Sequence, residues 1–295
     1  MLDLKDKIEL YAPFLSHYWL HLLSVGISFV IAKLIKGYIS KAGAEKDKSN
    51  TISMDEAIAQ DSTEDLGSDL YVLDEGKHIP YEHTNRMSET EMLKQAQDFY
   101  NFMNKRRSVR FISKEPVPSL DVIKTIVHTA GTAPSGAHMQ PWTFVVVSDA
   151  KVKSEIRKIV EEEEEVNYRK RMGSRWVNDL KALNTNWCKT YLEDAPYLIL
   201  VFKQVYGISP EGKQPHYYNE ISTCIAAGIL MTALHHAGLV TVTTTPLNCG
   251  PRLRVLLERP VNEKLLLLLP VGFPTADATV PDLKRKSIDQ IMVHF

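Results

Sequence analysis

The sequence predicts a three-layer core of α-helices and β-strands, of the α+β or α/β class, joined to an N-terminal membrane anchor. Three observations lead to this prediction. Short continuous apolar runs, typical of buried strands, alternate with longer segments whose apolar residues recur at helical spacing. A separate apolar stretch near the N-terminus is long enough to cross a membrane. A polar, acidic segment lies between that stretch and the core.

The composition is that of a globular protein and argues against two classes. Of 295 residues, 44% are hydrophobic and 24% charged, and the formal net charge is −1. A chain so close to neutral lacks the electrostatic footprint of a nucleic-acid-binding protein, and no metal-ligand spacing occurs. Cys188, Cys224 and Cys249 are odd in number and far apart, which favours reduced thiols over a disulfide framework.

The first 35 residues predict a membrane anchor. A polar segment, 1–12, precedes the mainly apolar stretch 13–35, whose length suffices for a single-pass helix. His17, His21 and Lys33 weaken this prediction, so a helix lying in the membrane interface is the alternative. Lysines are commoner after the stretch than before it, which by the positive-inside rule places the rest of the chain in the cytosol, at a cell or vesicle membrane.

Residues 36–90 predict a flexible linker. Acidic residues outnumber basic ones there, serine and threonine are frequent, and little apolar periodicity is present. Such a segment cannot bury enough apolar surface to fold alone. The folded domain is therefore expected to span 91–295.

The first half of this domain is predicted to be mainly helical. Apolar residues at helical spacing indicate one helix at its start and another over 120–130, and the apolar run 142–147 indicates a buried strand. Asp149 starts a further helix, which we expect to continue to about Leu192. Its 161–190 portion has little to bury, so we predict a lid that orders over a ligand.

The second half alternates apolar runs with turn signals. We expect, in order, a strand over 196–202, a Gly/Pro loop over 206–215, a helix over 217–237 stopped by Gly238, a β-branched strand over 239–245, a short helix over 251–257, a strand over 264–271 and a strand-like stretch at 291–293. The C-terminal tail, residues 281–295, is too short to fold alone, which suggests that it is exchanged with a second copy in a domain-swapped homodimer.

Two stretches can bind a phosphate-bearing planar cofactor. The guanidinium groups of Arg106, Arg107 and Arg110, beside the Ser108 hydroxyl, can form a forked phosphate receptor, although such a run is also typical of solvated surface. The loop Pro134-Ser135-Gly136-Ala137 lets a flat ligand approach the main chain, because it carries no bulky side chain. No Gly-x-Gly-x-x-Gly turn occurs, which disfavours a nicotinamide Rossmann site.

Three motifs together resemble the nitroreductase-fold flavoproteins: Arg106–Arg110, Ala133–His138 with Pro141-Trp142, and Thr243–Asn248. The similarity covers roughly 91–295. The acidic lid, the Tyr217–Glu220 segment and 281–286 are similar, more narrowly, to the iodotyrosine deiodinase family. The resemblance implies an α+β nitroreductase-like core that binds FMN at the interface of a homodimer.

The resemblance also implies a role for each site residue. The FMN-binding residues would be Arg106, Arg107, Ser108, Val109, Arg110, Pro134, Ser135, Gly136, Thr243, Thr244, Thr245 and Arg285. The hydroxyl of Thr245 would lie near the flavin N5 and assist transfer in one-electron steps. The backbone N–H of Ala137 would hold the substrate phenolate, so these two are the catalytic candidates.

The substrate residues also make chemical sense by themselves. Glu164 and Tyr168 are four residues apart, so they share one helix face. A carboxylate and a phenol there can bind an ammonium group, and Lys189 can pair with a carboxylate. Together they suit an amino-acid zwitterion. For Glu164 alone, a solvated glutamate in a charge run is the alternative.

The predicted reaction is the reductive removal of iodine from mono- and diiodotyrosine by reduced FMN, which leaves tyrosine and iodide. The resemblance implies NADPH as electron donor, directly or through a partner reductase. We keep two alternatives. One is a general FMN-dependent nitro- or quinone reductase, which does not need Glu164, Tyr168 and Lys189. The other is a non-catalytic, membrane-tethered flavin-binding sensor.

Overall fold

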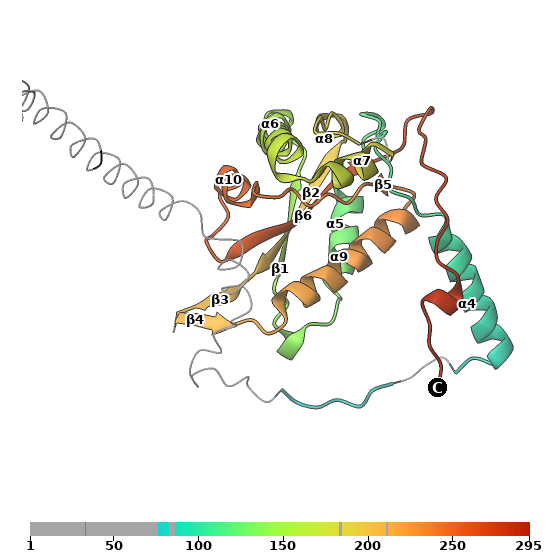
Figure 1. Ribbon diagram of the computed structural model, residues 1–295. Helices are drawn as coiled ribbons and strands as arrows, with labels where there is room; N and C mark the ends of the chain where they lie inside the picture. Colours follow the sequence, from blue (N-terminus) through green and yellow to red (C-terminus); the bar gives the residue numbers. More distant parts are fainter. Residues whose placement is uncertain (1–32, 34–75, 83–85, 183–184, 211) are drawn as a thin grey trace, which may run out of the picture. The chain divides into compact units, whose positions relative to one another are not determined.

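A four-stranded antiparallel sheet lies at the centre of the folded domain (Figure 1), as seen in a computed structural model. Its strands are β1 (Trp142–Val147), β2 (Tyr197–Gln204), β5 (Val240–Thr241) and β6 (Glu263–Gly272), in the order β1-β2-β6-β5. The two long central strands pair from Tyr197 with Val271 to Gln204 with Glu263. Because β2 is buried along nearly its whole length, its continuous apolar sequence reflects cover on both faces.

The structure describes Lys33 and residues 76–82, 86–182, 185–210 and 212–295. The predicted anchor 13–35, apart from Lys33, and most of the linker 36–90 lie outside these residues. Within the described part of the chain, no helix is both long and apolar enough to cross a membrane.

Helices cover both faces of the sheet, which confirms the three-layer prediction. Alternate residues of β2 point to opposite faces. Ile199 and Val201 belong to the core shared with α5 (Leu120–Ala130) and α9 (Asn219–His236). The other face packs in a second core. It contains Leu198, Leu200 and Phe202 of β2, with apolar residues of α6 (Ala150–Val166), α8 (Tyr191–Asp194) and α10 (Gly250–Leu256).

The predictions for 120–130 and 142–147 match α5 and β1 residue for residue. In α5 the side chain of Ser119 accepts a hydrogen bond from the backbone N–H of Val122 and caps the helix. The first helix of the domain, α4 (Glu89–Asn104), buries no residue, and in Figure 1 the C-terminal tail runs beside it. Arg285 of the tail donates a 2.7 Å hydrogen bond to Asn104 Oδ1.

The prediction of one helix from 149 to about 192 is wrong. The α-helix ends at Val166 and widens into a π-turn, η2 (Asn167–Arg171), before Met172 adopts an extended conformation. A separate helix, α7 (Ser174–Ala182), follows, and α8 begins only at Tyr191. After Val160 the segment has little apolar surface to bury, so packing does not hold a longer helix together.

Three other predictions are corrected. The 206–215 segment is a hairpin of β3 (Tyr206–Ser209) and β4 (Gly212–Pro215), whose turn uses Gly212 at a φ of 126°. The strand predicted over 239–245 shrinks to β5 and one bridge from Thr244 to Leu268, because the chain leaves the edge of the sheet between them. The stretch 291–293 forms no strand, since no sheet edge accepts it in the described chain. Before it lies a short 3₁₀ turn, η3 (Ile288–Gln290).

Candidate active site

A cavity of about 220 Å³ brings most of the predicted catalytic and substrate residues together. It lies between the C-terminal half of α6, the π-turn η2, the segment before α8 and the segment after β5. The predicted site residues that line it are Arg110, Glu164, Tyr168, Lys189, Thr243, Thr244 and Thr245. The structure thus joins residues that are more than a hundred positions apart in the chain.

Glu164 and Lys189 face each other across this cavity. The Lys189 ammonium is 3.6 Å from a carboxylate oxygen of Glu164, and the two side chains are only 10% and 12% exposed. The Tyr168 ring centroid lies 5.7 Å from the same ammonium. Burial lowers the pKa of Lys189 and the charge of Arg110 lowers it further, whereas Glu164 opposes the shift. A cation, an anion and a phenol therefore converge at one place.

The five consecutive glutamates of α6 are not a free acidic surface. Each pairs with its own cation: Glu161 with Arg157, Glu162 with Arg252, Glu163 with Arg171, Glu164 with Lys189, and Glu165 with Arg169. Successive residues of a helix point about 100° apart, so the five carboxylates reach partners on α6 itself, on η2, on α10 and on the segment before α8. The alternative of a solvated glutamate does not describe Glu164.

A second cavity, of about 250 Å³, lies beside Arg106, Arg107 and Val109. The segment that carries them runs next to β5: Ser108 forms a parallel bridge with Thr241, and the Val109 N–H donates to the Thr241 carbonyl at 3.0 Å. Arg110, the last residue of the segment, lines the first cavity instead. The same short segment therefore serves both cavities.

The second cavity fits a phosphate-bearing cofactor. Arg285 from the tail donates to the carbonyl of Arg106 at 2.9 Å, and Arg107 donates to the carbonyl of Pro281. Burial lowers the pKa of Arg106, as do the charges of Arg285 and Arg107. Among the described residues no carboxylate pairs with these three arginines, and the buried Thr241 hydroxyl has no hydrogen-bond partner. A phosphate would supply both the negative charge and the acceptor oxygens.

The Pro134–Ala137 loop is held in a strained conformation. Ala137, His138 and Gln140 have φ values of 47°, 55° and 47°, in the left-handed region that is unfavourable for residues with a Cβ. The Gln140 N–H donates to the Ser135 hydroxyl at 2.9 Å. Such strain persists where the surroundings impose it, and it is frequent at functional sites.

The loop packs closely at Gly136. A Cβ there would lie 3.0 Å from the carbonyl oxygen of Tyr217 and 3.1 Å from the Tyr218 ring, so the loop is packed against the start of α9. By contrast, Thr243 contacts the Met231 sulfur at 3.1 Å, near the other end of that helix. From Asn219 to Met231 an α-helix rises about 18 Å. Within one chain, therefore, Pro134, Ser135, Gly136 and Ala137 do not join the other predicted site residues.

Sequence reasoning missed several residues that support the site. Tyr191 lines the first cavity, and burial raises the pKa of its hydroxyl. Lys153, Arg157 and Glu161 of α6 hold the segment that carries Lys189. Their spacing of four residues, followed by a step of three to Glu164, was the available signal, because it places all of them on one helix face.

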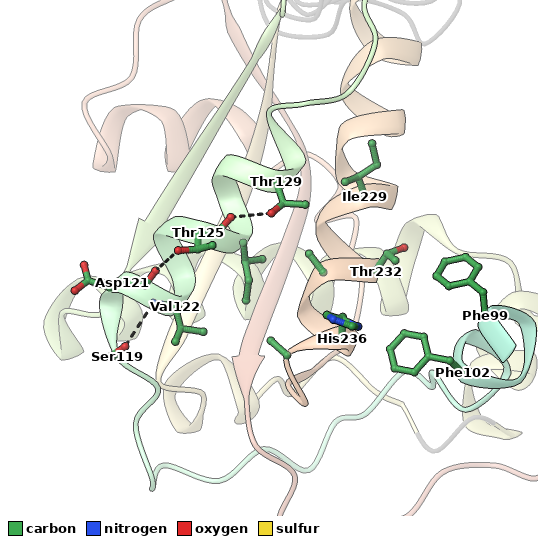
Figure 2. Close-up of a pocket in the computed structure, with 13 residues that line it drawn as sticks. Phe99, Phe102, Ser119, Asp121, Val122, Thr125, Thr129, Ile229, Thr232 and His236 are labelled. Carbon is green, nitrogen blue, oxygen red and sulfur yellow. Dashed lines mark hydrogen bonds between the residues drawn. The ribbon is translucent and has the colours of Figure 1, made fainter. Parts of the chain in front are cut away.

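A further cavity, of about 620 Å³, contains none of the predicted site residues (Figure 2). It lies between α4, α5 and α9, and its lining is mostly apolar. The two phenyl rings of Phe99 and Phe102 face Ile229, Thr232 and His236 across it. It offers neither the arginines for a phosphate nor the opposite charges for a zwitterion, so its chemistry differs from that of the other two.

Comparison with known proteins agrees with these features. Residues 103–273 match the sequence pattern of the nitroreductase family. Human iodotyrosine deiodinase 1 is 68% identical over 218 residues, which are 74% of this chain and 75% of the human one. The chain belongs to the nitroreductase family, in its iodotyrosine deiodinase branch. The resemblance and the nitroreductase-like α+β fold predicted from the sequence are thereby confirmed.

Two further relatives extend the comparison. The iodotyrosine deiodinase of Daphnia pulex is 50% identical over 305 aligned residues, which cover 98% of this chain and all of the relative. A crystal structure of oxidized iodotyrosine deiodinase bound to FMN and 3-iodo-L-tyrosine superposes with a TM-score of 0.56 at 32% identity. The superposition covers 66% of this chain and 97% of that one. The likeness thus extends to a relative that holds both a flavin and an iodinated amino acid.

Proposed function

We propose that this protein is an FMN-dependent oxidoreductase that converts mono- and diiodotyrosine to tyrosine and iodide. Each turnover adds two electrons and one proton to the substrate, breaks one carbon–iodine bond and forms one carbon–hydrogen bond. The observation that carries the proposal is the convergence of Glu164, Tyr168 and Lys189 in one cavity beside Thr243–Thr245. A solved relative holds FMN and 3-iodo-L-tyrosine, which supports the same pair of ligands here.

The chain's own residues would bind the charged head of the substrate. Glu164 and Lys189 already face each other at 3.6 Å. A bound zwitterion can therefore replace this ion pair by two ion pairs, one between Glu164 and its ammonium and one between Lys189 and its carboxylate. Glu164 then accepts hydrogen bonds from the α-ammonium, and Lys189 donates to the α-carboxylate. Tyr168 closes this end of the cavity through its hydroxyl. Because neither buried charge is left unpaired, the cavity favours ligands that carry both groups.

FMN would be held by Arg106, Arg107 and Arg285 around its phosphate, with Ser108, Val109 and Arg110 along the same segment and Thr243–Thr245 beside the ring. The chemistry that bound FMN supplies is electron transfer, with NADPH as the ultimate donor, directly or through a partner reductase. Thr245 lines the substrate cavity, which supports a role next to the reacting ring. The backbone N–H of Ala137 would stabilise the phenolate oxygen.

The site is proposed to form between two copies of the chain. Pro134–Ala137 lies about 18 Å along α9 from the Thr243 side of the site, so a second copy must supply this loop. On α9, Ile221 and Ile225 are 61% and 42% exposed although the helix is apolar on its opposite side too. A helix with apolar residues all round requires cover. The tail, which exposes Ile288, Ile291, Met292, Val293 and Phe295, is proposed to wrap the second copy.

The N-terminal anchor and linker remain a proposal from the sequence. Residues 13–35 would hold the protein at a membrane by a single helix, and 36–90 would link it to a cytosolic catalytic domain. Deletion of residues 1–40 should then yield an active protein that no longer sediments with membranes. A deleted protein that still sediments, or that has lost deiodination, would contradict this assignment.

The decisive experiment is anaerobic reduction of the purified yellow protein in the presence of 3-iodo-L-tyrosine, with iodide and tyrosine both measured. We expect one iodide and one tyrosine for each two electrons consumed. Preferential turnover of a nitroaromatic would identify a general reductase instead. FMN binding without iodide release would identify a sensor. Either of the latter results would reject the proposal.

A further inference from the structure

One face of α6 is directed at the chain segment that carries Lys189. Lys153 Nζ donates to the carbonyls of Glu193 and Ala195, at 3.2 and 2.7 Å. The remaining members of the face follow at intervals of four, four and three residues: Arg157, Glu161 and Glu164. This spacing keeps all four side chains on one side of the helix. The face therefore runs from a structural contact at Lys153 to the proposed substrate contact at Glu164.

Glu161 joins two donors with a single carboxylate oxygen. Its Oε1 accepts a 2.6 Å hydrogen bond from the backbone N–H of Lys189 and a 2.8 Å hydrogen bond from Arg157 Nε. The other arginine nitrogens reach Glu193 Oε2 at 2.9 Å and the Cys188 sulfur at 3.8 Å. Hydrogen bonding to Glu161 raises the pKa of Arg157, so its charge persists at every physiological pH.

This arrangement holds Lys189 from outside the cavity. The Arg157 and Glu161 side chains are 24% and 18% exposed, and neither lines the 220 Å³ cavity that Lys189 enters. The residues just before Lys189 belong to no helix or strand. Their positions depend on side-chain contacts such as these, because no backbone ladder fixes them.

We propose that Glu161, oriented by Arg157, is a positioning residue for substrate recognition. It fixes the main chain at Lys189, and so fixes where the ammonium meets the substrate carboxylate. This inference rests on the proposed function and adds to it a residue that does not touch the substrate. Without the acceptor, the Lys189 N–H loses its partner, and the main chain that places the ammonium opposite Glu164 is less constrained.

The test compares three variants with the wild-type full-length holoprotein. Glu161→Ala removes the acceptor and should raise KM for 3-iodo-L-tyrosine about 10-fold, the effect of losing one charge-assisted hydrogen bond. We expect kcat to change less than about 3-fold. Glu161→Gln keeps an acceptor oxygen and should restore KM to within about 3-fold of wild type. Glu162→Ala, the matched control, removes a neighbouring carboxylate that pairs only with Arg252 and should leave KM unchanged. An unchanged KM in Glu161→Ala would overturn the inference.

A double-mutant cycle shows whether Glu161 acts through Lys189. In a Lys189→Met background, Glu161→Ala should add less than about 2-fold to KM, because the group that it positions is already gone. Additive losses would overturn the inference. If Glu161→Ala does not fold, Arg157→Leu gives the same readout, with an expected rise in KM of about 3-fold, and an unchanged KM would count against the inference. A wild-type protein that releases no iodide would instead refute the proposed function.

Discussion

At the scale of single residues, the site depends on two buried charges that satisfy each other. Glu164 and Lys189 are each about one-tenth exposed. A buried charge that loses its partner is strongly unfavourable, whereas a pair that exchanges partners is not. An amino-acid head offers such an exchange, and an uncharged phenol does not. The two side chains therefore predict a preference for amino-acid substrates over other iodinated phenols.

Replacing Glu164 by Gln should weaken binding of 3-iodo-L-tyrosine and leave FMN bound. The variant removes the negative charge from a site whose cation remains, so the loss should be about 2 kcal/mol, roughly 30-fold in Kd. The Kd is measured by adding 3-iodo-L-tyrosine stepwise and following the fluorescence of the bound flavin. Glu165→Gln is the control, because Glu165 pairs with the exposed Arg169. Equal affinity of wild type and Glu164→Gln would remove this residue from the site.

The lowered pKa of Lys189 predicts an alkaline limit to substrate binding. Burial lowers this pKa, Arg110 lowers it further, and Glu164 only partly opposes the shift, so the ammonium loses its proton below the ordinary value of 10.5. Burial raises the pKa of Tyr168 and that of Tyr191, so each phenol loses its proton only above its ordinary value of 10.0. KM for 3-iodo-L-tyrosine should therefore rise as pH approaches 10.5 from below.

Lys189→Arg is the matching variant for this pH dependence. Its guanidinium keeps its charge to much higher pH. The alkaline rise of KM should therefore move upward in the variant, while the titration of the substrate's own ammonium affects both proteins equally. Coincident pH profiles of KM for the two proteins would show that Lys189 does not carry the effect.

At the scale of elements, α8 depends on α6. A helix of only four residues, Tyr191–Asp194, leaves most of its carbonyls without intrahelical partners. Lys153 donates to the carbonyl of Glu193 in this helix and to that of Ala195 just after it, and its side chain is buried against the end of the helix. This contact fixes the start of β2 and, through the same segment, the approach to Lys189.

Lys153→Met should lower the free energy of unfolding by about 2 kcal/mol, because two carbonyls lose a charged donor. Methionine keeps an unbranched side chain of similar length at this position. Urea unfolding followed by circular dichroism measures this change. Lys158→Met, an exposed position on the same helix, should stay within about 0.5 kcal/mol of wild type. A Lys153→Met protein as stable as the control would mean that α8 is held by packing alone.

At the scale of the whole molecule, the apolar face of α9 and the distant Pro134–Ala137 loop both favour the proposed site between two chains. The exposed face of α9 contains Ile221 and Ile225, and Ile229 of this helix lines the 620 Å³ cavity of Figure 2. A second copy that covers α9 would bury this surface. It would also bring its own loop toward the arginines of the first copy, so that each site uses both chains.

Ile225→Asp should convert the proposed dimer to a monomer, because an unpaired carboxylate in an apolar interface is strongly unfavourable. Light scattering after gel filtration gives the mass, and absorbance of the same peak gives the FMN content, which should fall with the mass. Val255→Asp, on α10 at a site that is 73% exposed, is the control and should change neither. A monomeric wild type that retains FMN would contradict the shared site.

Much of the fold was predictable because the signals are local. Leu120–Ala130 and Trp142–Val147 carry their periodicity in neighbouring residues, and the structure gives them the same bounds. The prediction that one helix continues to about Leu192 was wrong because its local signal is weak. Its polar part contains helix-forming residues but no apolar stripe, so packing decided where it broke.

The sequence by itself determined the family, the central strands and the residue types of the site, since motifs and apolar periodicity are properties of adjacent positions. Only the tertiary structure decided which cation meets each glutamate of 161–165, and that Glu161 holds the main chain at Lys189. It also decided that Ala137 lies far from Thr243 within one chain. The physical reason is that ion pairs and hydrogen bonds act over a few ångströms, and only the packing of helices on the sheet brings distant residues that close.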